Sequence, residues 1–447
     1  MTGRPGRVRL AALVVVAVGV TYSNAWHLGF IWDDYVVLRP RPWSELIRVW
    51  HGSWDSTGLL PEFYRPLAVW TDAAVFAAFG FDEVSLRAVA LLQLAVGAYL
   101  LGEFVRRETK AFWPGAFAAM FFALHPVVST SAGPWWFEQN HRLSVIAVAA
   151  ALLCWQSCRE DLRWRAWWKV HLWILIGSWF KEDVLAVAPL LIAFQLWRAR
   201  TLADVPSPSR RFLAASTSAW LSWFALRWAL LGQIAGTPTG PPTDGWINGV
   251  RAVTFGPWLT FLRIRGMNRE VEPIYQVTTA VLLAVAAAGL MIWRRGASPR
   301  DRLLMGYGAI GAVIFNVPVA IATYPTRYHL IALSAALFFT AAGLAIADVA
   351  RRNRMPRWCP AIAATATLVL FAFSTRAGLN RYRPCTEANL ALDRSMAKWL
   401  VETPEWQSSW VVAWLDEKSA RCGAGIYVSV TEAIPEVLRA VRAGRQR

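Results

Sequence analysis

Residues 10–20 read Leu-Ala-Ala-Leu-Val-Val-Val-Ala-Val-Gly-Val, an unbroken apolar run preceded by Arg4, Arg7 and Arg9. A basic start followed by an apolar core also describes a secretory signal, and Ser23-Asn24-Ala25 would suit its cleavage. Because many further apolar runs follow, we favour an uncleaved first transmembrane helix. The sequence after this run then lies outside the cytoplasm.

Two adjacent carboxylates follow, in the stretch Phe30-Ile31-Trp32-Asp33-Asp34-Tyr35. Neighbouring acids repel each other and prefer solvent, so they are poorly suited to packing. Asp is also a favoured N-cap residue, so the pair can simply start the next helix. Taken alone, the pair leaves both interpretations open, a helix cap and an active site.

The chain of 447 residues is 56% hydrophobic, with a mean hydropathy of +0.35. Runs of about 17–25 apolar residues, the length that spans a bilayer, recur along it. We predict an all-α polytopic membrane protein with about eleven spans, and the 27 tryptophans suit interfacial belts. The predicted spans are 8–28, 85–105, 111–127, 142–158, 168–181, 183–199, 212–232, 276–293, 303–323, 328–350 and 359–375.

The net charge of +17 comes largely from short connections between the predicted spans, so we expect no nucleic acid partner. Every second connection is basic, and basic connections face the cytoplasm. This pattern predicts a multi-pass protein of the inner (plasma) membrane with a cytoplasmic N-terminus. The connections expected outside are 29–84, 125–141, 181–183, 233–275, 324–327 and 376–447.

Two domains are expected. Residues 1–375 form the transmembrane domain, whose long first outer loop, 29–84, contains helices lying along the interface near 45–50 and 67–79. Residues 376–447 are more polar and predict a small extracytoplasmic α/β appendage. A disulfide between Cys385 and Cys422 would be chemically permitted there and stays open.

Four polar clusters are expected on the outer face, where ionisable residues next to spans are functional candidates. They are Trp32-Asp33-Asp34 with Tyr64-Arg65, then His125 with His141-Arg142, then Lys181-Glu182-Asp183, and finally Arg327-Tyr328-His329. Each has an ordinary explanation, such as a helix end, an interfacial turn or a snorkelling arginine. Together they gather carboxylates, guanidinium groups, imidazoles and aromatic rings on one face.

This combination suits sugar transfer from a lipid-linked phosphate. A carboxylate can take the proton from an acceptor hydroxyl as it attacks the anomeric carbon. Arginine binds the leaving phosphate through a bidentate fork and lysine as a point charge. Tryptophan and tyrosine offer stacking faces for a sugar, and a polyprenyl tail in the bilayer explains a membrane-embedded catalyst.

The ordered motifs Phe-x-Trp-Asp-Asp, Tyr-Arg-Pro-Leu, Leu-His-Pro-Val, Lys-Glu and a late Arg-Tyr resemble the GT-C superfamily of polytopic glycosyltransferases. The likeness, over about residues 8–350, is greatest to the transmembrane O-mannosyltransferases with tetratricopeptide repeats and their bacterial relatives. It implies a polyprenyl-phosphate sugar donor, an extracytoplasmic acceptor and a catalytic carboxylate, Asp33 or Asp34, with Asp33 favoured as the base. It also implies donor-phosphate ligands at Arg327, Lys181, Arg65 and Arg142, and substrate contacts at Trp32, Tyr64, His125, Glu182, Tyr328 and His329.

The sequence departs from the family pattern in three ways. Thr130 stands where the family usually has an acid, and the Trp-x-x-x-Arg element that follows is displaced by a short insertion, which leaves Arg142 as its equivalent. The repeats are replaced by the short tail. The sugar, with mannose as the family example, and the acceptor, a protein, lipid or cell-wall glycan, therefore stay open. A polymerase or ligase for lipid-linked oligosaccharide is one alternative, and a transporter or flippase is another, although no repeated halves are evident.

No cofactor is firmly implied. A divalent cation, Mg²⁺ or Mn²⁺, is compatible with the oxygen ligands of Asp33, Asp34 and Glu62. A metal-free base is an equally open interpretation.

Overall fold

The computed structural model describes residues 4–28, 37–38, 41–54, 63–80, 82–131, 133–159, 164–198, 207–232, 299–315, 329–352, 356, 358 and 360–380. Every element within these residues is a helix, which confirms the all-α polytopic prediction. The predicted span 276–293 lies outside the described residues, as do the strands expected in the C-terminal appendage. The span count and the appendage therefore stay predictions.

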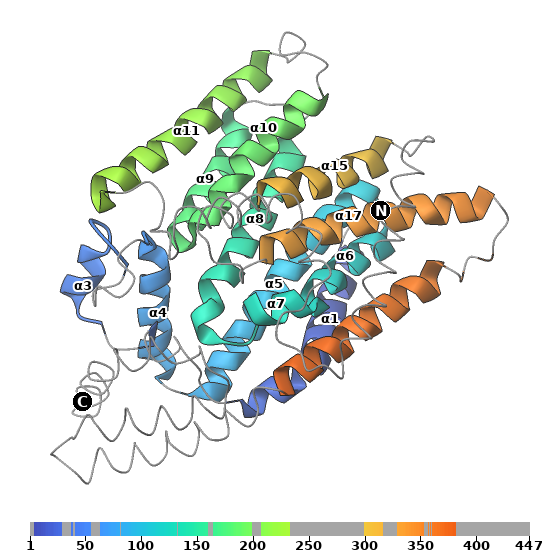
Figure 1. Ribbon diagram of the computed structural model, residues 1–447, viewed down its shortest axis with the longest axis horizontal. Helices are drawn as coiled ribbons and strands as arrows, with labels where there is room; N and C mark the ends of the chain where they lie inside the picture. The colour runs from blue at the N-terminus through green and yellow to red at the C-terminus, as the bar shows by residue number, and fades with distance from the viewer. Residues whose placement is uncertain are drawn as a thin grey trace, which may run out of the picture.

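Long helices running in alternating directions form the bundle (Figure 1). They are α1 (Arg4–Thr21), α5 (Glu83–Thr109), α6 (Phe112–Leu124), α8 (Gln139–Cys158), α9 (Trp164–Phe180), α10 (Val187–Arg198), α11 (Ser207–Leu231), α15 (Pro299–Ile314), α17 (His329–Arg352) and Pro360–Asn380. Among the described helices, α5, α8, α17 and Pro360–Asn380 are long and apolar enough to cross a membrane.

Short elements lie between the long helices. They are η1 (Ser23–His27), α3 (Trp43–Arg48), α4 (Pro66–Phe79), α7 (Pro126–Ser131), η2 (Trp136–Glu138) and η3 (Glu182–Ala186). We call the end of the bundle that carries α3, α4 and η3 the Glu182 end. The opposite end, where α5 and α8 finish and α9 begins, is the Glu103 end.

Small residues let α5 and α6 approach closely, as is common where helices pack in membranes. A Cβ built on Gly102 would lie 2.7 Å from the carbonyl oxygen of Gly115, and one on Gly115 would lie 2.6 Å from that of Gly102. Only glycine fits at this crossing. The core also includes α8 against both α5 and α9, and α15 against α17.

The first and last described helices meet at the Glu182 end. The Tyr22 hydroxyl donates to the carbonyl of Ala123 (3.0 Å), and the Thr375 hydroxyl donates to that of Leu124 (2.9 Å). Arg376 donates to the carbonyl of Val20 (2.8 Å). Because the helix continues to Asn380, it extends beyond the predicted span, which ended at 375.

Two local features refine the expected boundaries. α6 ends at Leu124 because His125 is extended (ψ 127°), and Pro126 opens α7, where its missing N–H costs nothing. α11 begins at Ser207, before residue 212, where its span was predicted to begin.

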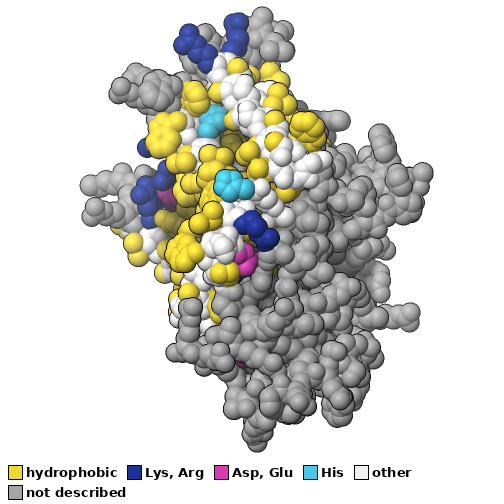
Figure 2. Space-filling view, turned by 90° about the vertical axis from the view of Figure 1, so that its left-hand side faces the viewer, with side chains coloured by type: hydrophobic (Ala, Val, Ile, Leu, Met, Phe, Trp, Pro, Cys, Tyr) yellow, Lys and Arg dark blue, Asp and Glu magenta, His cyan; other side chains and the backbone are white. Residues whose placement is uncertain are grey.

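The helices α3 and α4 agree with the interfacial helices predicted in the first outer loop. Leu46 of α3 and Val49, the residue after it, pack against α4, and the Trp70 indole donates to the carbonyl of Leu46 (2.9 Å). The opposite face of α3 exposes 70% of Trp43 and 58% of Ile47. Figure 2 shows the molecule from the side on which α3 lies in Figure 1. Hydrophobic side chains predominate on the described surface there, with a few charged and histidine side chains among them.

We expect Gly115→Ala to destabilise the protein by about 1–3 kcal/mol, because the added methyl overpacks the α5–α6 crossing. Gly19→Ala on α1 is the matched control, since a Cβ there meets nothing within 4 Å. That change should be neutral or slightly stabilising, because alanine favours a helix over glycine. Thermal unfolding in detergent compares the two, and equal effects would contradict the proposed close contact.

Candidate functional site

The turn between α9 and α10 places Lys181, Glu182 and Asp183 at one end of the bundle. Lys181 is extended and donates its backbone N–H to the carbonyl of Gly177 (2.8 Å), so the chain reverses with almost no loop. A Cβ on Gly177 would lie 2.6 Å from the Val184 side chain, which shows how tightly the turn packs on α9. The three polar residues are therefore held rigidly.

Glu182 lies between two buried arginines from distant parts of the chain. Its Oε2 accepts a hydrogen bond from Arg65 Nε (3.0 Å) and its Oε1 accepts one from Arg227 Nη1 (3.0 Å). Both arginine side chains are 3% exposed and that of Glu182 is 19% exposed. The backbone N–H of Tyr64 also donates to Oε1 (3.2 Å). We call Arg65, Glu182 and Arg227 the Glu182 cluster.

Electrostatics keep the Glu182 carboxyl ionised. Burial by itself would raise its pKa, but the positive charges of Arg65, Arg227 and Lys181 outweigh burial and hold the pKa below its ordinary value. Two guanidinium groups share one carboxylate, so the cluster carries a net positive charge. Such an excess of fixed positive charge suits an anionic group.

Aromatic rings surround the Arg65 guanidinium, which lies 4.1 Å from the ring centre of Phe63 and 5.4 Å from that of Trp54. A cation above a ring face is attracted by the ring quadrupole. Tyr64 points elsewhere, and its hydroxyl donates to the carbonyl of Trp50 (3.1 Å). The rings fix the Arg65 head group in one orientation.

A second buried network adjoins the cluster. Oδ2 of Asp183 lies 3.2 Å from His329 Nε2 and 3.8 Å from Lys181 Nζ. The His329 ring stacks on that of His141 at 4.5 Å, and His141 Nδ1 contacts the Glu138 carboxylate. Both histidines are at most 1% exposed. The network links α17, α8 and η3.

Arg142 holds the chain that enters α8. Its Nε donates to Gln93 (3.0 Å), and its Nη1 donates to the carbonyls of Gly133 and Trp135. Arg87 supports the same segment through the carbonyl of Pro134. These bonds anchor a loop in the bundle, and the assignment of Arg142 to the donor phosphate stays a prediction.

The structure brings together four of the residues singled out by the sequence: Arg65 with Glu182, and Lys181 with His329 through Asp183. His125 packs separately, against Phe121 and Phe371, and its Nδ1 accepts the backbone N–H of Val127 (3.2 Å). The remaining candidates, Trp32, Asp33, Asp34, Arg327 and Tyr328, lie outside the described residues.

Sequence reasoning missed Arg227 and left Asp183 and Glu138 without a role. A lone arginine at the outer end of the apolar span 212–232 was the available signal for Arg227. Within the part of the chain that is described, no group of three histidine, cysteine or acidic side chains is arranged to hold a metal. The residues considered for Mg²⁺ or Mn²⁺, Asp33, Asp34 and Glu62, lie outside that part.

Comparisons with known proteins agree with this architecture. The family model described as dolichyl-phosphate-mannose-protein mannosyltransferase matches residues 61–223, and no curated protein matches the chain. The fold is similar to that of the archaeal oligosaccharyltransferase AglB from Archaeoglobus fulgidus, solved in complex with an inhibitory peptide and a dolichol-phosphate. The TM-score is 0.53 at 14% sequence identity, over 83% of this chain and 56% of that one.

The chain thus spans little more than half the length of AglB. The family match over residues 61–223 and the similarity of fold agree with the resemblance to the GT-C superfamily of polytopic glycosyltransferases noted in the sequence. The matched segment contains Arg65, His125, Arg142, Lys181, Glu182 and Asp183.

We expect Glu182→Gln to destabilise the protein by roughly 3 kcal/mol, because it removes the carboxylate that pairs with two buried guanidinium groups. Asp348→Asn on α17 is a matched control. Asp348 also pairs with two arginines, Arg351 and Arg352, but its side chain is 41% exposed and theirs are 65% and 69% exposed. Its loss should cost about 0.5 kcal/mol or less. Similar shifts in thermal unfolding would contradict the assigned burial.

The stability gap between wild type and Glu182→Gln should depend on pH in one direction. Because the folded pKa is depressed, the contribution is complete above the unfolded value of about 4.3 and is lost as pH falls through the folded pKa. The gap should stay constant from about pH 8 to 5 and shrink below about pH 4. Unfolding midpoints across this range test it, and a gap that closes near neutral pH would show that Glu182 is not held ionised.

Proposed function

We propose that the protein transfers a sugar, with mannose the first candidate, from a polyprenyl-phosphate donor to an acceptor at the Glu182 end of the bundle. The observation that carries the proposal is the Arg65–Glu182 ion pair. It joins two motifs 117 residues apart, both within the segment matched by the mannosyltransferase family model. The matched segment therefore contains both partners of an ion pair that forms only when the chain is folded.

The charge of the Glu182 cluster fits a lipid-linked phosphate. When the bond between the anomeric carbon and the phosphate oxygen breaks, the leaving phosphate gains negative charge. Preorganised positive groups in a water-poor site stabilise such charge far better than solvent does. We propose that Arg65, Arg227 and Lys181 provide it and that Glu182 orients both arginines.

The acceptor is activated, in this proposal, by Asp33. Its carboxylate takes the hydroxyl proton while the acceptor oxygen bonds to the anomeric carbon and the lipid phosphate departs from the opposite side. This single displacement inverts the anomeric configuration. Asp34 would position the acceptor or a cation.

The distribution of basic residues supports placing the Glu182 end outside the cytoplasm. Arg106, Arg107 and Arg159 lie at the Glu103 end, as do Arg351 and Arg352 at the close of α17. Cytoplasmic ends of spans are enriched in such residues. The same rule favours a cytoplasmic N-terminus, and we propose the inner (plasma) membrane as the location.

A second candidate reaction is transfer of an oligosaccharide from a lipid-linked donor. The fold similarity to AglB, an oligosaccharyltransferase by its name, favours considering it. The two reactions differ in donor, since one uses a monosaccharide on a polyprenyl phosphate and the other a preassembled oligosaccharide.

The decisive experiment reconstitutes the purified protein in nanodiscs with radiolabelled polyprenyl-phosphate mannose and an extract of extracytoplasmic acceptors. We expect label transfer by the wild type and a loss of about 10²–10⁴-fold for Asp33→Asn, the usual contribution of a general base. Asp348→Asn should keep full activity, because that residue lies at the other end. Full transfer by a folded Asp33→Asn protein would remove Asp33 from the mechanism.

The same nanodiscs distinguish the alternatives. Transfer only from a polyprenyl-diphosphate oligosaccharide would replace the proposed donor with that of an oligosaccharyltransferase. Movement of labelled lipid across the membrane without formation of a glycosidic bond would instead identify a transporter.

A further inference from the structure

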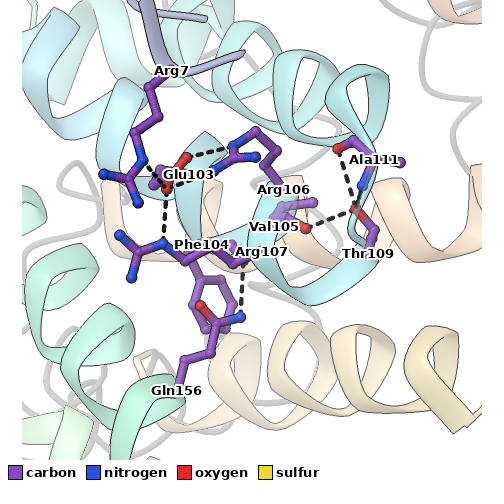
Figure 3. A network of polar contacts seen from close by, with 9 residues as sticks. All are labelled: Arg7, Glu103, Phe104, Val105, Arg106, Arg107, Thr109, Ala111 and Gln156. Carbon is purple, nitrogen blue, oxygen red and sulfur yellow. Dashed lines mark hydrogen bonds and ion pairs between the residues drawn. The ribbon is translucent and has the colours of Figure 1, made fainter. Parts of the chain in front are cut away.

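The Glu103 end carries a second concentration of charge, unrelated to the proposed active site. Glu103 of α5 is 3% exposed and pairs with three guanidinium groups: Arg7 Nε at 3.2 Å, Arg106 Nε at 2.6 Å and Arg107 Nε at 2.7 Å (Figure 3). These contacts join α1 to α5. One carboxylate serves three cations, so the cluster has an excess of positive charge.

A neighbouring pair joins α5 to α8. Nη1 and Nη2 of Arg159 donate to Oε2 and Oε1 of Glu108 at 3.0 and 2.9 Å. Gln156 donates to the same Oε2 (2.6 Å) and to the carbonyl of Phe104 (3.1 Å). This bidentate arrangement neutralises Glu108 and fixes its position.

A cavity of about 440 Å³ opens beside these groups. It is lined by Arg107, Glu108, Lys110, Gln156 and Arg159, with Leu303 as an apolar wall. The polar lining comes from the last turns of α5 and α8, and the apolar wall comes from the start of α15. It therefore lies where two spans end.

Two cationic side chains at this cavity have hydrogen-bond donors that their described contacts do not use. Lys110 occupies the left-handed C-cap position of α5 (φ 56°, ψ 24°), and its ammonium has no partner within the described part of the chain. Arg107 contacts Glu103 through Nε, which leaves its terminal nitrogens for another acceptor. The ion pairs of Arg7, Arg106 and Arg107 are with Glu103 and that of Arg159 is with Glu108, so the basic groups at this end outnumber the carboxylates they pair with.

We propose that this cavity binds the phosphate of an anionic phospholipid. Cationic donors suit a phosphate, and basic pockets between helix ends at the membrane surface are sites for acidic head groups. Two features identify a lipid as the source. Leu303 gives the cavity an apolar side, and Trp113, 74% exposed at the start of α6, lies close in sequence to Lys110, as an interfacial tryptophan would.

The test measures lipid binding to the full-length protein by native mass spectrometry. The detergent-solubilised protein is titrated with phosphatidylglycerol and, separately, with phosphatidylcholine, which carries the same phosphate without net negative charge. We expect preferential binding of phosphatidylglycerol. Lys110→Gln should weaken it about fivefold, as expected from about 1 kcal/mol per basic residue near an acidic surface, and Lys110→Gln with Arg107→Gln by about 25-fold.

The control variant removes Arg351 and Arg352 by substitution with glutamine. They lie at the end of α17, are exposed and pair with Asp348, so phosphatidylglycerol binding should be unchanged. An equal loss in the control would reduce the effect to general surface charge and overturn the site. Full retention of binding by Lys110→Gln would do the same, and this exposed substitution is not expected to disturb folding.

The last part of the test uses inorganic phosphate as a competitor of the lipid. Displacement of phosphatidylglycerol by millimolar phosphate would assign the cavity to a soluble anion and overturn the lipid as its source. If phosphate fails to displace phosphatidylglycerol, the result supports a lipid as the source of the bound phosphate.

Discussion

The carboxylate of Glu182 between Arg65 and Arg227 is the constraint on which one end of the bundle depends. The three residues come from the start of α4, the turn of η3 and the last turns of α11. Removing such charges from water costs several kcal/mol for each ion, so they are stable there only when all three elements close around them. Formation of the cluster and completion of this end of the fold are therefore one event. The unequal count of charges leaves the assembled site positive.

The Glu103 end has a similar arrangement of charges, but its side chains are more exposed to solvent. There a carboxylate also sits among several guanidinium groups, but the outer members are partly exposed, with 37% of the Arg107 side chain in contact with solvent. At the Glu182 end the arginines are enclosed by aromatic rings and by the turn itself. The enclosed cluster suits the sugar transfer proposed above, and the open one suits the proposed binding of a phospholipid head group. This contrast arises from burial, since the residue types are nearly the same.

Much of the fold could be predicted from the sequence, because apolar run length and alternating basic connections are direct consequences of the bilayer. The gathering of Arg65 with Glu182 was also anticipated, from their expected location on one face. The role of Arg142 was harder to predict, since the sequence does not reveal whether a guanidinium group binds backbone carbonyls or a ligand. Arg227 was missed because a single arginine near a helix end looks the same whether it snorkels to the interface or turns inward to a carboxylate.

The tight reversal at Lys181 has a mechanical consequence. Glu182 and Asp183 have no flexible segment of their own, because the turn is bonded to Gly177 on one side and continues directly into α10 on the other. η3 can therefore move only together with α9 and α10. For the proposed lipid-linked donor, we therefore expect the thickness and fluidity of the surrounding bilayer, which act on whole helices, to affect exchange at this turn.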